Sequence, residues 1–161
     1  PGNKPAPLAS ASAADLATMP EYYVMAMDKT MPQTVAQAMP TAEQVSACAW
    51  LPDKDLAVYA LSFAATGFQG GLQWYRAFGS AASQAELLLF AGLTISVPAC
   101  FIAGASDWGI YQSPGAFEAM QSLACSDLRS CNLIPDAGHW VQQEQPEVVV
   151  DKLLAFLAGM R

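Results

Sequence analysis

The chain has 161 residues, 53% of them hydrophobic and 13% charged, and its formal net charge is −7. Soluble domains average about 45–50% apolar and about 25% charged residues, so we expect one domain whose surface is partly covered by further chain or by a partner. The seven Lys and Arg residues are scattered, which excludes a nucleic-acid surface because phosphate binding requires clustered cations.

Neither a membrane span nor a metal site is expected. The longest apolar stretch, residues 86–106, is broken by Pro98 and by glycines, and a span needs about 20 apolar residues. No leader pattern precedes the first helix signals, so a cytoplasmic location is expected, and the gene is expected to start upstream of Pro1. With one histidine and no CxxC pair we expect no zinc site. The four thiols, at Cys48, Cys100, Cys125 and Cys131, are expected to be free and mostly buried, and no cofactor is expected.

The first part of the chain predicts a linker followed by helices. Residues 1–14 are rich in Pro, Ala and Ser, which is typical of a linker or extended lead-in. Residues 15–92 predict a helical cap region. Thr30 with Gln33, and Thr41 with Gln44, form capping-box patterns at two helix starts. Further helices are predicted over 51–67, 70–79 and 83–92, the first beginning with Pro and acids and ending at glycine.

The pattern changes near residue 93, where strand signals begin. Residues 95–104 predict a strand buried on both faces, 113–124 a helix, 128–135 a second strand and 145–160 a terminal helix. This order predicts a right-handed parallel crossover unit. Because a parallel sheet needs several strands, we expect an α/β fold in which residues 93–161 form only the last strands and helices of a mostly parallel sheet. The N-terminal half of that sheet is expected to be absent from this chain.

Two polar residues follow the predicted strands. Asp107 comes just after the first strand and His139, the only histidine, just after the second. Functional groups in open α/β sheets gather at the carboxyl ends of the strands. A carboxylate on one imidazole nitrogen fixes the tautomer and leaves the other nitrogen to accept a proton. The alternative interpretation is that Asp107 caps the following helix and His139 is a hydrogen-bonded turn residue.

Several segments resemble the epoxide hydrolase group of the α/β-hydrolase superfamily. They are "GFQGGLQWYRAF", "VPACFIAGASDWG" and "AGHWVQQEQPEVV", and the resemblance covers roughly residues 16–158. It implies an α/β-hydrolase-like fold with a helical cap, and a reaction in which a nucleophilic aspartate opens an epoxide to an ester that activated water then hydrolyses to a vicinal diol. His139 matches the base of that reaction and Asp107 its orienting acid.

The resemblance also implies residues that contact the substrate. Two cap tyrosines hydrogen-bond the epoxide oxygen; Tyr75 matches one, and Tyr23 is the choice for the other, with Tyr22 as the close alternative. Aromatic packing is the competing interpretation for these tyrosines. Trp140, Trp108, Tyr22 and Phe68 are the candidate substrate-binding residues, with Trp140 lining the pocket or packing beside the histidine, while Trp74 and Phe78 are expected in the core.

The sequence departs from the family at the nucleophile. It contains neither the His-Gly pair of the oxyanion segment nor a G-x-S-x-G elbow, and Asp107 is rejected as nucleophile because it follows the cap region. We therefore expect the missing N-terminal half of the hydrolase, from the same gene or another chain, as a partner, together with a small apolar epoxide and water, and this fragment alone is expected to be inactive. A haloalkane or haloacid dehalogenase, another α/β-hydrolase, and a non-catalytic fragment that needs a partner chain or forms a homodimer remain alternatives.

Overall fold

A computed structural model describes residues 4–160, which fall into two compact units. The first unit contains the described residues up to Ala47 together with those from Thr94 onward, and the second contains Cys48–Leu93. Residues 1–3 of the expected lead-in, and residue 161, lie outside the described part. The expected boundaries, a cap over 15–92 and a core over 93–161, stay a prediction.

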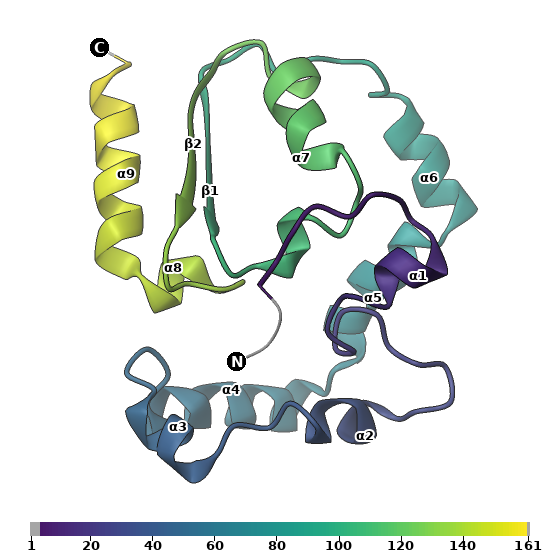
Figure 1. The fold of residues 1–161 in the computed structure, drawn as a ribbon, viewed down its shortest axis with the longest axis vertical. Helices are drawn as coiled ribbons and strands as arrows, with labels where there is room; N and C mark the ends of the chain where they lie inside the picture. Colours follow the sequence, from purple (N-terminus) through teal and green to yellow (C-terminus); the bar gives the residue numbers. More distant parts are fainter. Residues whose placement is uncertain (1–3, 161) are drawn as a thin grey trace. The chain divides into compact units, whose positions relative to one another are not determined.

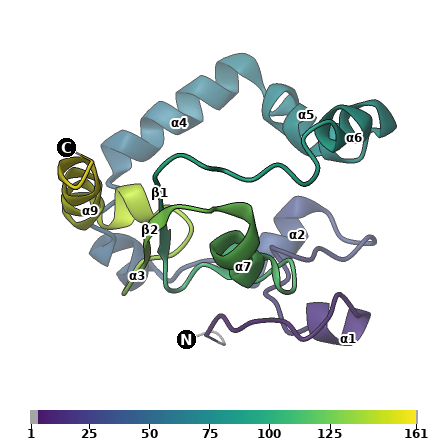
Figure 2. The same ribbon diagram turned by 90° about the horizontal axis from the view of Figure 1, so that it is seen from above.

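A parallel strand pair forms the centre of the first unit. Strands β1 (Ala99–Gly104) and β2 (Leu128–Ile134) pair in parallel, with Gly104 opposite Ile134. They are connected through η1 (Trp108–Ile110), α7 (Ala116–Ala119) and the π-helical turn η2 (Met120–Ala124), and β2 is followed by α8 (Val141–Glu144) and α9 (Pro146–Ala158). Helices α7 and α9 flank the two strands on opposite sides (Figures 1 and 2). The predicted order of strand, helix, strand and helix is confirmed.

Burial of the strands is less complete than predicted. Only Ala103 and Gly104 of β1, and Ile134 of β2, are buried. Ile134 packs with Ala137 and Val141 in a small core that Ile102 and Val149 partly cover. The prediction of a strand buried on both faces is wrong for the described residues, because two strands with one helix on each side leave their remaining faces and edges uncovered.

The N-terminal segment of the first unit forms three short helices. These are α1 (Ala13–Leu16), α2 (Met31–Ala36) and α3 (Ala42–Ala47). Both capping boxes are confirmed: the Thr30 amide donates to Gln33 Oε1 at 2.8 Å, and Thr41 exchanges two hydrogen bonds with Gln44. Leu8, inside the expected lead-in, is buried against Met19 and Trp108, so this part of the segment packs on the unit.

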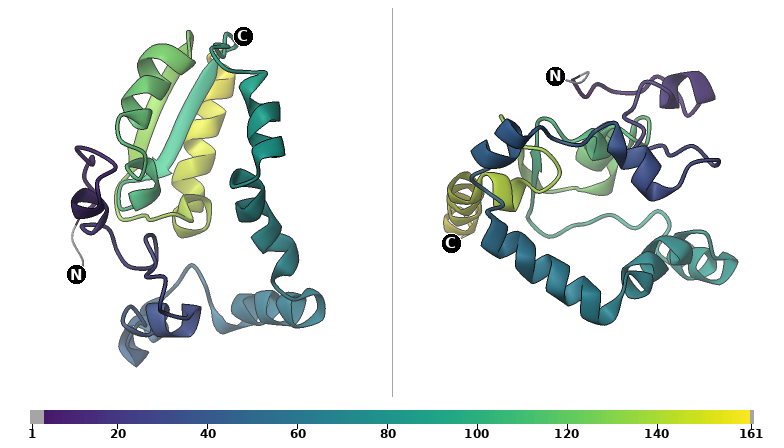
Figure 3. Two further views of the ribbon diagram at one scale, coloured as in Figure 1. Left: turned by 90° about the vertical axis from the view of Figure 1, so that its right-hand side faces the viewer. Right: turned by 90° about the horizontal axis from the view of Figure 1, so that it is seen from below.

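The second unit is a succession of three helices. Helix α4 (Asp53–Thr66) ends at Gly67, whose φ of 67° lets the chain turn into α5 (Gln69–Phe78), and α6 (Ala81–Leu88) follows (Figure 3). None of the residues in these helices is buried. The rings of Trp74 and Phe78 contact each other edge to face, with 5.3 Å between their centroids, but both residues are more than half exposed. The prediction that they lie in a core is wrong.

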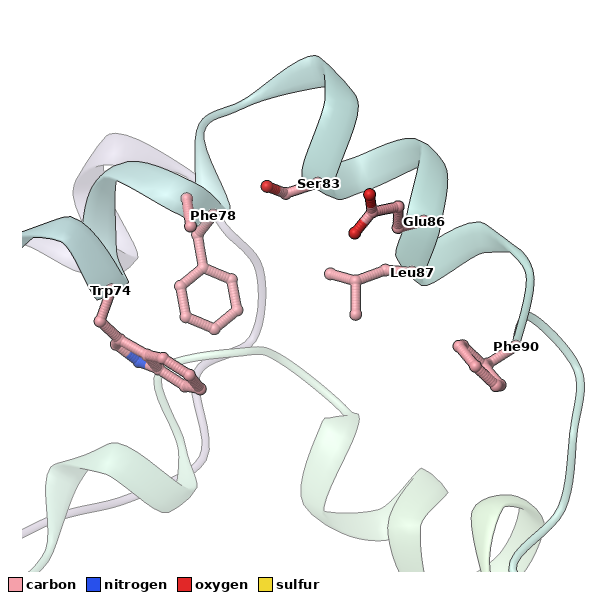
Figure 4. A pocket seen from close by; sticks show the side chains of 7 residues that line it. Trp74, Phe78, Ser83, Glu86, Leu87 and Phe90 are labelled. Atoms are coloured by element: carbon pink, nitrogen blue, oxygen red, sulfur yellow. The ribbon is translucent and has the colours of Figure 1, made fainter.

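A hollow of about 290 Å³ lies between α5 and α6 of the second unit (Figure 4). Its lining is aromatic and aliphatic with one hydroxyl and one carboxylate, and consists of Trp74, Ala77, Phe78, Ser83, Glu86, Leu87 and Phe90. The neighbouring Tyr75 is not part of this lining. The hollow is therefore a mostly apolar surface feature of the helical segment and does not contain Tyr75, the tyrosine expected to contact the substrate.

The thiols and the helix lengths bear on two further expectations. All four cysteines are free, but only Cys125 is buried, and Cys131 is exposed on β2. The expectation of mostly buried thiols is thus wrong, because the strands that carry Cys100 and Cys131 are incompletely covered.

No helix within residues 4–160 combines the length and apolarity required to cross a membrane.

Gly104 ends β1 where the chain after β2 comes closest. A Cβ atom at this position would lie less than 3.0 Å from the carbonyl oxygens of Ala137 and Gly138. We expect Gly104→Ala to lower the free energy of unfolding by about 1–3 kcal/mol, because the backbone before His139 must move. Chemical denaturation measures this change. Gly71→Ala in α5, where nothing lies within 4 Å, should instead stabilise the chain by about 0.5–1 kcal/mol, and equal effects of the two changes would contradict the prediction.

Candidate active site

Asp107 occupies the turn directly after β1 and accepts three hydrogen bonds or close polar contacts. Its side chain caps η1, with Oδ1 accepting the Gly109 amide at 2.7 Å, and the same oxygen accepts the Tyr23 hydroxyl at 2.8 Å. Its other oxygen, Oδ2, lies 3.0 Å from His139 Nδ1. The residue is 8% exposed. The capping role that was the alternative interpretation therefore coexists with the contact to the histidine.

His139 lies in the turn after β2, at the same end of the strand pair as Asp107. A carboxylate only accepts hydrogen bonds, so the contact assigns a proton to Nδ1, and in the neutral tautomer Nε2 is then the nitrogen with the free lone pair. The side chain is 62% exposed, and Nε2 can reach a water molecule or a substrate. The predicted acid–histidine pair is present in the structure, and it has the form of an oriented general base.

Backbone hydrogen bonds tie the two turns together. The Ala105 amide donates to the Ile134 carbonyl at 2.8 Å, and the Ser106 amide donates to the Ala137 carbonyl at 2.9 Å. Asp136 lies between the two acceptor residues, Ile134 and Ala137. It adopts a left-handed conformation with φ 55°, which Asp tolerates better than most residues. The parallel register and these two bonds bring together residues that are 32 positions apart in the sequence.

The environment of Tyr23 keeps its hydroxyl protonated. Partial burial, and then the hydrogen bond to Asp107 and the negative charge of that carboxylate, raise the pKa of the Tyr23 phenol above its ordinary value. A phenol with a raised pKa stays a donor through the neutral range. In this structure the Tyr23 proton is directed at Asp107, a contact that no sequence pattern indicated.

The other predicted site residues take different positions. Trp140 packs edge to face beside His139, with 5.6 Å between the ring centroids, and is half exposed. Packing beside the histidine was one of the two roles expected for it. The ring of Tyr22 packs on that of Tyr23, with 5.2 Å between the ring centroids. Trp108 is buried with Leu8 and Met19, and this burial favours a packing role over direct contact with a substrate.

Tyr75 and Phe68 belong to the second unit. Tyr75 lies on α5 with 73% of its surface exposed. The ring of Phe68 stacks on that of Phe63, with 4.5 Å between the ring centroids. Their assignment to substrate contact stays a prediction. Within residues 4–160, no group of three or more His, Cys, Asp or Glu side chains forms a candidate metal site.

The sequence interpretation assigned no role to Glu144. Its carboxylate accepts the Gly138 amide at 2.8 Å and the Trp140 amide at 3.0 Å, so it holds both neighbours of His139. The available signal was an acid in the first turn of a helix that starts two residues after the histidine. That pattern predicts an acid near backbone amides but not which amides it binds.

A parallel strand pair with an acid and a histidine at its carboxyl ends, flanked by helices, matches part of the α/β-hydrolase fold. The solved structure of potato (Solanum tuberosum) epoxide hydrolase is similar to this chain. The TM-score is 0.64 and the identity 28%, over 76% of this chain and 39% of that chain. The structure of epoxide hydrolase A from Mycobacterium thermoresistibile is similar with a TM-score of 0.60 and 39% identity, over 69% of this chain and 33% of that one.

Sequence comparison gives the same group. Epoxide hydrolase A of Mycobacterium tuberculosis is 42% identical over 113 residues, which are 70% of this chain and 33% of that protein. Epoxide hydrolase 2 of Siraitia grosvenorii is 30% identical over 152 residues, which are 89% of this chain and 46% of that protein. No family model matches the chain. The chain thus spans less than half the length of these relatives, and its resemblance to part of the epoxide hydrolase group of α/β-hydrolases is confirmed.

Proposed function

We propose that this chain supplies the general base, its orienting acid and the cap tyrosines of an epoxide hydrolase. The observation that carries the proposal is the 3.0 Å contact between Asp107 Oδ2 and His139 Nδ1, on an imidazole that is otherwise well exposed. The similarity to proteins named epoxide hydrolases, in sequence and in structure, supports the choice of substrate class.

The proposed reaction has two steps. The carboxylate of an aspartate in a part of the hydrolase outside this sequence attacks an epoxide carbon, and the carbon–oxygen bond breaks to give an alkoxide and an ester. His139 Nε2 then removes a proton from water, whose oxygen attacks the ester carbonyl. The resulting imidazolium is stabilised by Asp107. Collapse of the tetrahedral intermediate releases the second diol oxygen. The two protons of the attacking water, one taken by His139 and one left on the new carboxyl group, then pass to the two alkoxide oxygens, so a neutral vicinal diol leaves and both the carboxylate and the neutral imidazole are restored.

The tyrosines serve the first step of this proposal. A hydroxyl that donates to the epoxide oxygen stabilises the alkoxide as it develops, and Tyr75 and Tyr23 are the two proposed donors. Because the Tyr23 hydroxyl donates to Asp107 in this structure, Tyr23 must exchange that acceptor for the epoxide oxygen when substrate binds. Trp140, Tyr22 and Phe68 are proposed to supply apolar contact to the substrate.

The proposed partner is the remaining part of the hydrolase sheet. The support is the number of large apolar side chains that stay exposed in both units, among them Leu88, Leu89, Leu123, Leu154 and Leu157. Exposed apolar surface of this kind marks an interface. Association with a second copy of this chain is the alternative, and size-exclusion chromatography with light scattering separates the two. A cytoplasmic location stays a prediction.

An isotope experiment tests the two-step mechanism. The hydrolase that contains this chain, in excess over a styrene-oxide-type epoxide, is allowed one turnover in water labelled with ¹⁸O. In the ester mechanism both oxygens of the first diol come from the epoxide and the aspartate, so the label appears in the protein and not in the diol. Label in the first diol, or no hydrolysis of the epoxide, would contradict the proposal.

Tyr75→Phe is expected to slow formation of the ester. Loss of one donor to the developing alkoxide raises the barrier by roughly 1–3 kcal/mol, as removal of an oxyanion donor does in other hydrolases. Single-turnover kinetics of the same hydrolase measure the rate. Tyr59→Phe, on the neighbouring helix α4 of the second unit, is the matched control and should leave the rate unchanged. An unchanged rate in Tyr75→Phe would assign Tyr75 to packing.

A further inference from the structure

Glu144 binds the backbone amides of the two residues that flank His139 with one carboxylate. Oε2 accepts the Gly138 amide at 2.8 Å, and Oε1 accepts the Trp140 amide at 3.0 Å. We infer that Glu144 is a positioning residue for the base, and that it fixes the backbone of His139 while Asp107 fixes the ring. This inference rests on the proposed role of His139 and adds a residue to it.

The exposed ring of His139 needs such an anchor. The imidazole is 62% exposed, so packing of the ring alone constrains it little, and its direction depends on the conformation of residues 138–140. A ring that turns with its backbone loses the alignment of Nδ1 with Asp107. Two hydrogen bonds from the amides of Gly138 and Trp140 to the oxygens of one carboxylate remove that freedom, and bonds to a carboxylate are stronger than those between neutral groups.

The anchor is itself fixed to the core. Val141, at the start of α8, is buried with Ile134 and Ala137. The Trp140 carbonyl accepts the amides of Gln143 at 2.7 Å and Glu144 at 2.9 Å. Glu144 therefore stands on a helical turn that is attached to the end of β2, and its carboxylate transmits this fixed position to the turn that carries the base.

Space at residue 138 is matched to the carboxylate. A Cβ atom on Gly138 would lie 3.3 Å from Glu144 Oε1, which is tighter than an ordinary contact. The close approach of the carboxylate to the backbone is thus made possible by glycine. Only a carboxylate of this length offers two acceptor oxygens here, since a glutamine amide presents one acceptor and one donor.

The test is nuclear magnetic resonance of the isotopically labelled 161-residue chain without substrate. His139 is the only histidine, so its ring signals need no separation from others. At a pH where the ring is neutral, we expect the Nδ1–H tautomer to predominate in the unchanged chain, and Glu144→Gln to lose that preference. We also expect the Gly138 or Trp140 amide to exchange with solvent about tenfold faster, which corresponds to one lost hydrogen bond.

Glu147→Gln is the matched control, because it removes the same charge three residues further along, in the first turn of α9. It should leave the tautomer and both amides unchanged. Should Glu144→Gln not fold, Glu144→Asp carries the test: it keeps the charge, but the shorter side chain cannot reach both amides, and the tautomer preference should again be lost. A tautomer unchanged in a folded Glu144 variant overturns the inference. Failure of the isotope experiment overturns the reaction alone, because the tautomer is measured without turnover.

Discussion

In the proposed epoxide hydrolase, His139→Gln is expected to stop the reaction at the covalent alkyl-enzyme ester. Glutamine keeps a polar side chain after β2 but cannot accept a proton from water, so the first step proceeds and the second does not. General bases contribute typically 10²–10⁴-fold, and turnover should fall by about that factor. Intact-protein mass spectrometry after a short incubation with a styrene-oxide-type epoxide should show a mass increase of one substrate equivalent.

Gln142→Ala is a suitable comparison, because it changes an exposed side chain three residues after His139, on helix α8. This variant should turn over at the original rate and accumulate no ester. Full activity of His139→Gln without an adduct would remove His139 from the mechanism.

Asp107→Asn is expected to have the second large effect, on both turnover and stability. The carboxylate accepts from Tyr23 and Gly109 and faces Nδ1 of His139. An asparagine amide offers a single acceptor oxygen and turns an N–H donor toward one of these groups. With the wrong tautomer favoured at His139, kcat should fall by about 10⁴-fold, the effect of the same change in a Ser-His-Asp hydrolase.

The stability effect of Asp107→Asn can be measured on the chain itself. A buried donor that loses its acceptor costs about 1–3 kcal/mol, and Asp107 is 8% exposed. Chemical denaturation should show a loss of that size. Asp136→Asn is the control, because Asp136 is exposed at φ 55° and Asn tolerates this conformation; its effect should stay within about 0.5 kcal/mol. Equal stability of both variants would show that the three contacts to Asp107 contribute little.

Local patterns in the sequence were sufficient for two helix starts and for the approximate positions of both strands, whereas the helix predicted over 83–92 lies at Ala81–Leu88 and β1 begins only at Ala99. The capping boxes at Thr30 and Thr41 involve residues three positions apart, and both are present. The apolar runs at 95–104 and 128–135 predicted the two strands, because a short apolar run and its flanking turn residues are local properties, and the helix between them predicted parallel pairing. Parallel pairing then brings the two strand ends together, which is why Asp107 and His139 could be predicted as a pair from one sequence.

Tertiary structure alone decided what surrounds that pair. The Tyr23 hydroxyl reaches Asp107 across 84 positions of sequence, and no periodicity encodes such a contact. The exposure of Trp74, Phe78 and Cys131 depends on which surfaces the rest of the chain covers, not on their own apolar character. Glu144 was visible in the sequence as an acid, but its two amide partners follow from the turn geometry that folds α8 back on residues 138–140. Sequence determined which groups lie at the strand ends, and packing determined how each of them is held.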